Sequence, residues 1–146
     1  MSQKEIEDIL QKYRVMAVVG LSRDKDKPSY CVAEYMKTQE YQIIPVNPFV
    51  DEILGEKSYK SLLEIPLKIQ KKIEIVDIFR RPDDVPLIVE EAVKLKISNG
   101  KPYVIWMQQG IVNERASETA RKAGLTVVMD KCIMVEHKRV STKRDK

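Results

Sequence analysis

The sequence predicts an α/β fold: a Rossmann-like, doubly wound sheet of five parallel strands in the order 3-2-1-4-5. Two observations predict it. Short apolar runs rich in β-branched residues alternate along the chain with segments whose apolar residues recur at helical spacing. The predicted strands also lack a polar face, which is typical of parallel sheets that helices cover on both sides and connect by right-handed crossovers.

The first predicted element is a short helix. Ser2 and Glu5 stand at capping-box spacing, and apolar residues follow them at helical intervals. The apolar run at residues 15–20 is predicted as the first strand, and residues 29–39 as the helix after it. Residues 42–46 are predicted as a second, short strand that ends in a proline-rich turn.

The middle of the chain supplies the third strand and a longer helix. A loop with one helical turn near residues 58–64 leads to the third predicted strand at residues 74–79. Pro82 suits the first turn of a helix, with acidic residues near its positive end, and Gly100 closes it. The stripe that this helix buries is expected to be Val85, Ile88, Val89, Ala92 and Leu95.

The last third of the chain repeats the alternation. Residues 104–107 are predicted as the fourth strand, and Asn113 can cap a helix that stops at Gly124. Residues 125–129 are predicted as the fifth strand, followed by a short final helix that ends near Arg139.

Length, composition and charge limit the possible classes of protein. The 146 residues suit one domain, and the 43% hydrophobic and 33% charged residues are ordinary for a globular chain. The net charge of +4 arises entirely within residues 138–146, so we expect a folded domain over residues 1–140 and a flexible basic tail over residues 141–146 rather than a nucleic-acid-binding arm.

The expected location is the cytoplasm. No apolar run approaches the about 20 residues that cross a bilayer, and the start of the chain has no signal-peptide pattern, so we expect no membrane partner. Cys31 and Cys132 are far apart and form no CxxC pair, which indicates neither a disulfide framework nor a zinc site.

Ligands of doubly wound sheets bind outside the carboxyl ends of the strands, here at the expected switch between strands 1 and 4. The loop after the first strand has a glycine that permits close approach, two hydroxyls and three cations beside a helix start, which together favour a pyrophosphate. These residues are Gly20, Ser22, Arg23, Lys25, Lys27 and Ser29. The alternative is that Gly20 only turns the chain and the charged residues solvate the loop.

The loop after the second strand argues against NAD. The first loop does not have the spacing G-x-G-x-x-G, and Asn47 stands where an NAD site would carry an acid for the ribose diol. Because Asn47 is uncharged, the ligand can carry a phosphate on its ribose. The alternative is that Pro45 and the residues after it form only a rigid turn.

Two further loops complete the candidate site. Arg80 and Arg81 can clamp a phosphate while Phe79 flanks an adenine, although Arg81 can instead pair with Asp83 or Asp84. After the fourth strand, the amides of Gln108 and Gln109 and the backbone near Gly110 can hydrogen-bond a ligand that itself carries amides. Trp106 is expected in the core rather than against the ligand.

These loops closely resemble those of the small, single-domain coenzyme A-binding proteins, whose fold also forms the first domain of the succinyl-CoA synthetase α subunit. The matching strings are VVGLS at 18–22, PVNP at 45–48, EILG at 52–55, VDIFRRP at 76–82, WMQQGI at 106–111 and GLTVVMD at 124–130. They span nearly the whole chain, so the resemblance implies that residues 1–140 form a CoA-binding domain.

The resemblance implies that coenzyme A binds through its 3′-phospho-ADP end and its pantetheine arm. The carried-over contacts are Gly20, Ser22, Asn47, Arg80 and residues 108–110. With the neighbouring loop residues, the complete candidate set is Gly20, Ser22, Arg23, Lys25, Lys27, Ser29, Tyr30, Pro45, Val46, Asn47, Phe79, Arg80, Arg81, Met107, Gln108, Gln109 and Gly110. In the synthetases a histidine of a second domain is phosphorylated; no such second domain is expected here, and His137 is expected to be exposed on a helix.

No arrangement of nucleophile and base stands out in the sequence, so the favoured function is a non-catalytic CoA or acyl-CoA binding module, a sensor or carrier. One alternative is an enzyme, or an enzyme subunit, that acts on the CoA thiol or on acyl-CoA with a partner chain; another is an NAD-responsive regulator. A homodimer is also possible. Cys31 or Cys132 could exchange with the CoA thiol, unless each is only a small apolar side chain in the core.

Overall fold

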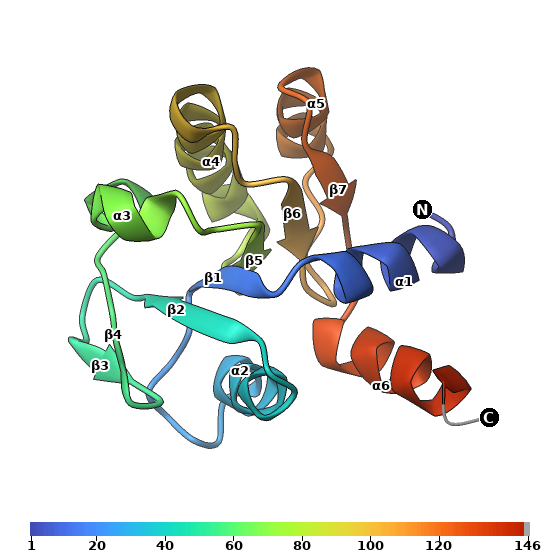
Figure 1. Cartoon of the computed structure of the whole chain (residues 1–146). Helices are drawn as coiled ribbons and strands as arrows, with labels where there is room; N and C mark the ends of the chain where they lie inside the picture. Colours follow the sequence, from blue (N-terminus) through green and yellow to red (C-terminus); the bar gives the residue numbers. More distant parts are fainter. Residues whose placement is uncertain (145–146) are drawn as a thin grey trace.

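The computed structural model describes the backbone of residues 1–144 and the side chains of residues 1–142. Five of the described strands form a parallel sheet in the order β2-β1-β5-β6-β7 (Figure 1). These strands are β1 (Val15–Val19), β2 (Gln42–Val46), β5 (Ile75–Ile78), β6 (Val104–Met107) and β7 (Thr126–Val128). The predicted α/β class and parallel sheet are confirmed.

The predicted strand order was wrong. Counted along the chain, the five strands lie in the order 2-1-3-4-5, so the third strand, β5, lies between β1 and β6 and not outside β2. Pro45 explains the difference, because proline has no N–H to donate and is confined to edge strands. The carbonyl of Pro45 faces away from β1 and accepts a hydrogen bond from the backbone N–H of Tyr59 (3.1 Å). The switch point of this sheet is therefore between β1 and β5.

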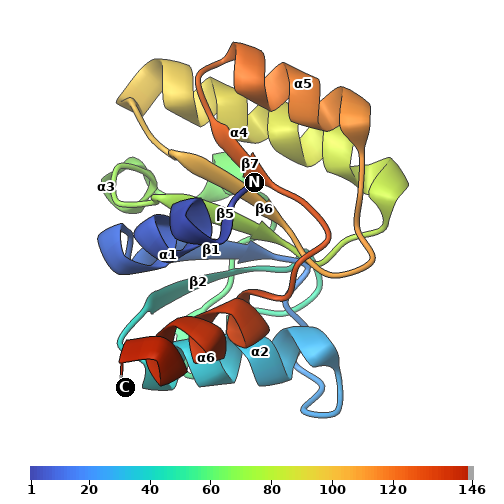
Figure 2. The same ribbon diagram turned by 90° about the vertical axis from the view of Figure 1, so that its right-hand side faces the viewer.

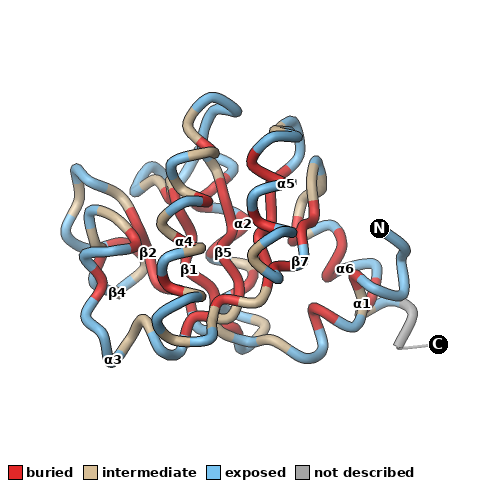
Figure 3. The backbone as a smooth tube through the Cα atoms, turned by 90° about the horizontal axis from the view of Figure 1, so that it is seen from above, coloured by how far each residue is buried: buried red, intermediate tan, exposed pale blue. Residues whose placement is uncertain are grey.

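Helices cover both faces of the sheet (Figure 2). On one side lie α1 (Gln3–Lys12), α2 (Pro28–Thr38) and α6 (Ile133–Arg144), and on the other lie α4 (Val85–Asn99) and α5 (Glu114–Lys122). Each face carries its own core cluster among the described residues, and the strands are the most completely buried part of the chain (Figure 3). Trp106 is fully buried, as expected of a core residue, and its indole N–H donates to the carbonyl of Lys131 (2.7 Å).

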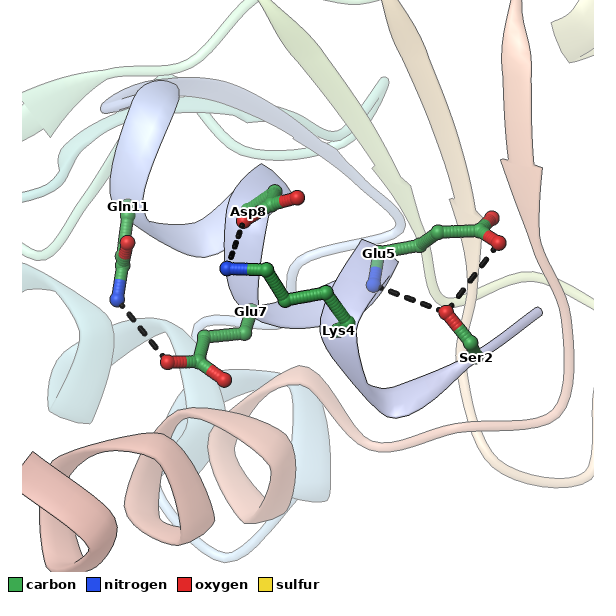
Figure 4. A network of polar contacts seen from close by, with 6 residues as sticks. All are labelled: Ser2, Lys4, Glu5, Glu7, Asp8 and Gln11. Atoms are coloured by element: carbon green, nitrogen blue, oxygen red, sulfur yellow. Dashed lines mark hydrogen bonds and ion pairs between the residues drawn. The ribbon is translucent and has the colours of Figure 1, made fainter.

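The ends of the helices follow the expected signals. The backbone N–H of Glu5 donates to the hydroxyl of Ser2 (3.1 Å), and that hydroxyl donates to the Glu5 carboxylate (3.2 Å), as Figure 4 shows. Asn113 accepts from the backbone N–H of Ala116 (2.9 Å) at the start of α5. Gly100 ends α4 in the left-handed conformation, so these three caps are confirmed. Pro82, predicted in the first turn of this helix, instead begins the 3-10 turn η2 (Pro82–Asp84), and α4 begins at Val85.

The connection from β2 to β5 contains a hairpin and a short helix that were not predicted from the sequence. A hairpin of β3 (Glu52–Ile53) and β4 (Glu56–Lys57) is followed by the 3-10 turn η1 (Leu62–Glu64) and the short helix α3 (Leu67–Gln70). The predicted helical turn near residues 58–64 corresponds to η1. Tyr59 bridges to Val46, so this connection folds back along the outer edge of β2.

The carboxyl-terminal helix differs from expectation. It extends through Arg144, so its predicted end near Arg139 was early and the predicted tail at residues 141–146 is helical through residue 144; residues 145 and 146 lie outside the described residues. His137 was expected to be exposed but is only 8% exposed, because α6 packs against α1 and α2. Its Nδ1 is 2.8 Å from the hydroxyl oxygen of Tyr35. No helix in the described part of the chain is long and apolar enough to span a membrane.

Candidate functional site

A pair of adjoining cavities lies over the carboxyl ends of the strands, where the loops after β1, β5, β6 and β7 converge (right side of Figure 2). The cavity beside the start of α2, which we call the α2 lobe, has a volume of about 600 Å³. The cavity beside the end of β2, the β2 lobe, has a volume of about 440 Å³. Gly20, Ser22 and Arg80 line both lobes, so the lobes adjoin along these residues.

Most of the predicted residues come together in this site. Those that line one or both lobes are Gly20, Ser22, Lys27, Ser29, Val46, Asn47, Phe79, Arg80, Arg81, Gln108 and Gln109. Those that line neither lobe are Arg23, Lys25, Tyr30, Pro45, Met107 and Gly110. Tyr30 and Met107 are core residues on opposite faces of the sheet, because their positions in α2 and β6 turn them toward the packed layers.

Gly20 brings two loops into contact at the switch point. It follows β1 with a φ of +90°, and its backbone N–H donates to the carbonyl of Val46 (2.9 Å). A β-carbon at this position would lie 2.9 Å from Cδ of Arg80 and would clash with the carbonyl oxygen of Phe79. Gly20 therefore does more than turn the chain, since its missing side chain lets the β1 and β5 loops meet at the wall between the lobes.

The start of α2 presents a positive helix end to the α2 lobe. Pro28 occupies the first turn and Lys27 precedes it without a side-chain cap, so the dipole of α2 and the Lys27 ammonium act on the same space. The Ser29 hydroxyl accepts from the backbone N–H of Ser22 (2.9 Å), and the Ser22 hydroxyl accepts from that of Asp24 (3.0 Å). Both hydroxyls thus order the loop, and each keeps its O–H as a donor.

The two arginines after β5 share one carboxylate. The guanidinium Nη2 of Arg80 is 3.0 Å from Oδ2 of Asp84, and Nε of Arg81 is 3.5 Å from the same oxygen. The pairing of Arg81 with Asp84, weighed as an alternative, is confirmed. Because Arg80 is half exposed and lines both lobes, an anion in the site would compete with Asp84 for it.

The side chain of Asn47 fastens two loops together. Its Nδ2 donates to the carbonyl of Leu21 (2.9 Å), and its Oδ1 accepts from the backbone N–H of Phe49 (2.8 Å). It lines the β2 lobe, but its amide is largely used by these backbone partners. These two hydrogen bonds hold the turn at residues 45–48 in place, which agrees with the alternative that the turn is rigid. The turn also lines the β2 lobe.

Several residues of the β2 lobe were not identified from the sequence, among them an aromatic, a cation and an exposed leucine. Phe49, 89% exposed, follows the proline turn; Lys60 comes after the β3–β4 hairpin; and Leu87, 68% exposed, lies in the first turn of α4. An aromatic residue directly after Pro48 was the available signal for Phe49. Lys60 had none, because the fold of the connection brings it to the site. Glu91 also lines this lobe, and burial raises the pKa of its carboxyl although Leu62 donates a hydrogen bond to it.

Gln108, a buried amide that lines the α2 lobe, contacts a buried acid that lines neither lobe. Gln108 is 3% exposed, and its Nε2 donates to Oδ1 of Asp77 (2.6 Å), which lies in β5 and is 1% exposed. Burial raises the pKa of Asp77 to about 7, and the hydrogen bond from Gln108 opposes part of this rise. Asp77 was not among the predicted site residues.

The two cysteines are in different surroundings. Cys132 is half-buried and lines the α2 lobe, whereas Cys31 is exposed and its Sγ lies 3.4 Å from the carbonyl oxygen of Lys25. Neither is a fully buried apolar side chain. Within the described residues, no group of three or more His, Cys, Asp or Glu side chains could hold a metal ion.

Comparisons with known proteins agree on one family. A family described as "CoA binding domain" matches residues 14–138. The uncharacterized protein YneT of Bacillus subtilis strain 168 is 43% identical over 136 residues, which cover 93% of this chain and 94% of YneT. The solved structure of a hypothetical protein from Pyrococcus horikoshii OT3 is 36% identical, with a TM-score of 0.87 over 97% of this chain and 93% of that one.

A longer relative is an enzyme. The ADP-forming acetate–CoA ligase of Methanocaldococcus jannaschii is 33% identical over 79 residues, which cover 54% of this chain but only 11% of the ligase. The similarity therefore extends over one part of the ligase.

Proposed function

The chain belongs to the family of CoA binding domains, and from this premise we propose that it binds coenzyme A or an acyl-CoA across both lobes, as a sensor or carrier that catalyses no reaction by itself. One observation carries the proposal: the two lobes meet at a wall formed by Gly20 and Arg80, beside the positive end of α2. A long polyanionic ligand with a pyrophosphate in its middle suits a site that offers an arginine and a helix N-terminus where its two lobes meet.

The pyrophosphate binds between α2 and Arg80. Lys27 and the dipole of α2 provide positive charge from one side, and Arg80 provides it from the other. Arg80 would exchange its exposed ion pair with Asp84 for a charge-assisted bond to the phosphate.

The adenosine end occupies the β2 lobe. The exposed ring of Phe49 and the side chain of Leu87 offer apolar surface for the base, and Lys60 offers a cation for the phosphate on the ribose. The same lobe contains Asp84 and Glu91, so the position of that phosphate depends on Lys60 and Arg80.

The pantetheine arm occupies the α2 lobe. Gln108 and Gln109 can hydrogen-bond its amides, and Val32, Ile111 and Cys132 surround the rest of the lobe. Cys132 lines this lobe and Cys31 does not, so Cys132 is the nearer cysteine to the thiol end of the pantetheine arm. We therefore predict that exchange with a CoA disulfide occurs at Cys132.

Titration with CoA, dephospho-CoA and NADH tests the proposal. We expect CoA to bind tightest, dephospho-CoA more weakly because it lacks the ribose phosphate, and NADH most weakly because Asn47 provides no carboxylate for a ribose diol. Equal affinity for CoA and dephospho-CoA would contradict the role of Lys60, and absence of CoA binding would overturn the proposal. Tightest binding of NADH would favour an NAD-responsive regulator instead.

The similarity to a much longer acetate–CoA ligase favours a second candidate, a subunit that acts on acyl-CoA together with a partner chain. Incubation with acetyl-CoA, phosphate and ADP distinguishes the two, because an ADP-forming ligase run in reverse cleaves the thioester to acetate and free CoA while phosphate and ADP form ATP. A carrier returns acetyl-CoA unchanged, whereas release of free thiol by this chain, alone or with a co-purifying protein, supports the enzyme.

We also predict a possible homodimer, no nucleic-acid partner and a cytoplasmic location.

A further inference from the structure

Asp77 is a carboxylic acid in the middle of a central strand. It is 1% exposed, and its strand neighbours are Val18 in β1 and Trp106 in β6. The alternation along β5 directs Asp77 to the same face as Ile75, the face covered by α2 and α6. An acid in such a position is destabilising unless a specific interaction compensates for its burial.

That interaction is with Gln108, whose orientation is fixed from the other side. The Oε1 of Gln108 accepts from the backbone N–H of Ile133 (3.3 Å), the first residue of α6. A backbone N–H can only donate, so the oxygen end of the amide must face Ile133 and Nε2 must face Asp77. Asp77 therefore holds the nitrogen end of an amide that forms part of the α2 lobe.

We propose that Asp77 is a positioning residue that holds Gln108 in the α2 lobe and makes ligand affinity in this lobe depend on whether its carboxyl is ionised. The proposal rests on the proposed function in one respect, that the ligand is a polyanion whose pantetheine arm covers Gln108. The hydrogen bond between Asp77 and Gln108 and its response to pH do not depend on the identity of the ligand.

The surroundings of Asp77 supply few charges. By sequence, the neighbouring strands β1 and β6 carry no ionisable side chain. On the helices and loop that cover this face, the buried or half-buried ionisable side chains are Glu7 in α1, Tyr30 and Tyr35 in α2, Lys131 and Cys132 before α6, and Glu136 and His137 in α6. Glu136 pairs with Arg139 (3.2 Å), and His137 contacts Tyr35. Burial is the main cause of the raised pKa of Asp77, so its proton is exchanged near neutral pH.

A bound polyanion would increase this effect. The ligand would exclude water from the lobe above Gln108, and its phosphates would repel a second negative charge, so the bound state favours the protonated carboxyl. Binding is then coupled to proton uptake at Asp77. Ligand affinity should fall as the pH rises through about 7, by at most about tenfold per pH unit because one proton is involved.

The experiment compares the wild type with Asp77→Asn, which keeps the shape of the side chain and removes its charge, by calorimetric titration with CoA between about pH 5.5 and 8.5. Glu136→Gln is the matched control, because Glu136 is also a buried acid on this face but its carboxylate pairs with Arg139 and not with a residue that lines a lobe. Dephospho-CoA is titrated in parallel, because it lacks the ribose phosphate whose own ionisation changes in this range.

We expect the affinity of the wild type and of Glu136→Gln to fall with rising pH, and that of Asp77→Asn to lose this fall for both ligands. An unchanged pH dependence in Asp77→Asn overturns the proposal, because a purely structural role would weaken binding equally at every pH.

A measurement on the ligand-free wild type keeps the test independent of CoA binding and of the folding of the variant. The side-chain amide resonances of Gln108 should shift with pH, with a midpoint near 7, as Asp77 titrates. If these resonances do not titrate, the proposal fails even if CoA binds. If they titrate but CoA does not bind at any pH, the proposed function fails and the coupling of Asp77 to Gln108 remains.

Discussion

Gly20 and Phe79 meet across the carboxyl ends of β1 and β5, and a β-carbon on Gly20 would collide with the carbonyl oxygen of Phe79. The contact lies at the switch point of the sheet, where the two lobes join. The neighbouring Arg80 owes its position between the lobes to this close approach. The stability of the fold and the shape of the site therefore depend on the same glycine.

Gly20→Ala should impair both stability and binding. The positive φ costs about 1–2 kcal/mol for a residue with a side chain, and the clash with Phe79 adds to this, since a backbone carbonyl cannot move aside easily. Urea denaturation measures the stability and calorimetry the CoA affinity. Gly124→Ala is the control: Gly124 has a φ of +87° but no atom within 4 Å of the added carbon, so only the backbone cost should appear. Equal losses in the two variants would contradict the clash.

The sequence predicted the type of nearly every large element because local signals and tertiary packing agree in this chain. Asn113 and Gly100 stand at helix ends, and β6 has the bounds expected of the fourth strand. The predicted strand order was wrong because it placed the second strand inside the sheet, although the missing N–H of Pro45 is a signal for an edge strand.

The part of the candidate site formed by the loops directly after the strands could be predicted, because parallel strands bring their carboxyl ends to one edge of the sheet. Gly20, Arg80 and Gln108 were found in this way and line the lobes. Lys60 reaches the site only because the β3–β4 hairpin folds back on β2, which no local pattern reveals. The sequence did not identify Asp77 as the partner of Gln108, because the two residues are 31 positions apart and no local pattern links them.

Arg80→Gln should weaken CoA binding by about ten- to a hundredfold, the effect of losing a hydrogen bond to a charged group. Arg80 lines both lobes, and its ion pair with Asp84 is exposed, so the folded state should lose little stability. Calorimetry at low and high salt provides a second criterion, because the affinity of the variant should depend less on salt than that of the wild type. Arg121→Gln, a change at the surface of α5, should leave both properties unaltered. An Arg80→Gln affinity equal to that of the wild type would contradict the phosphate contact.

Phe49→Ala should lower the affinity for CoA with almost no change in stability. The residue is 89% exposed, so its ring contributes little to the core, but it lines the lobe to which we assign the adenine. Stacking of a base on an aromatic ring is worth about 1–3 kcal/mol. Ile97→Ala removes another highly exposed apolar side chain, on α4 and outside both lobes, and should bind CoA normally. If both variants bind as the wild type does, the base does not rest on Phe49.

Asp77 should also make the stability of the ligand-free protein depend on pH. Its pKa is raised from 3.8 to about 7 in the folded state, so the folded chain holds this proton more tightly than the unfolded chain does. The contribution of Asp77 to the free energy of unfolding is therefore greatest below about pH 4, decreases as the pH rises to about 7, and is then constant. The total decrease is at most about 4 kcal/mol.

Other acids also make the free energy of unfolding depend on pH. Urea denaturation of Asp77→Asn is therefore compared with that of the wild type at each pH. Relative to the wild type, the variant should become progressively more stable between about pH 4 and 7, because an amide has no charge to bury. A difference in stability that is the same at every pH would show that the Asp77 carboxyl does not titrate in this range, and its hydrogen bond to Gln108 would then be a fixed structural contact.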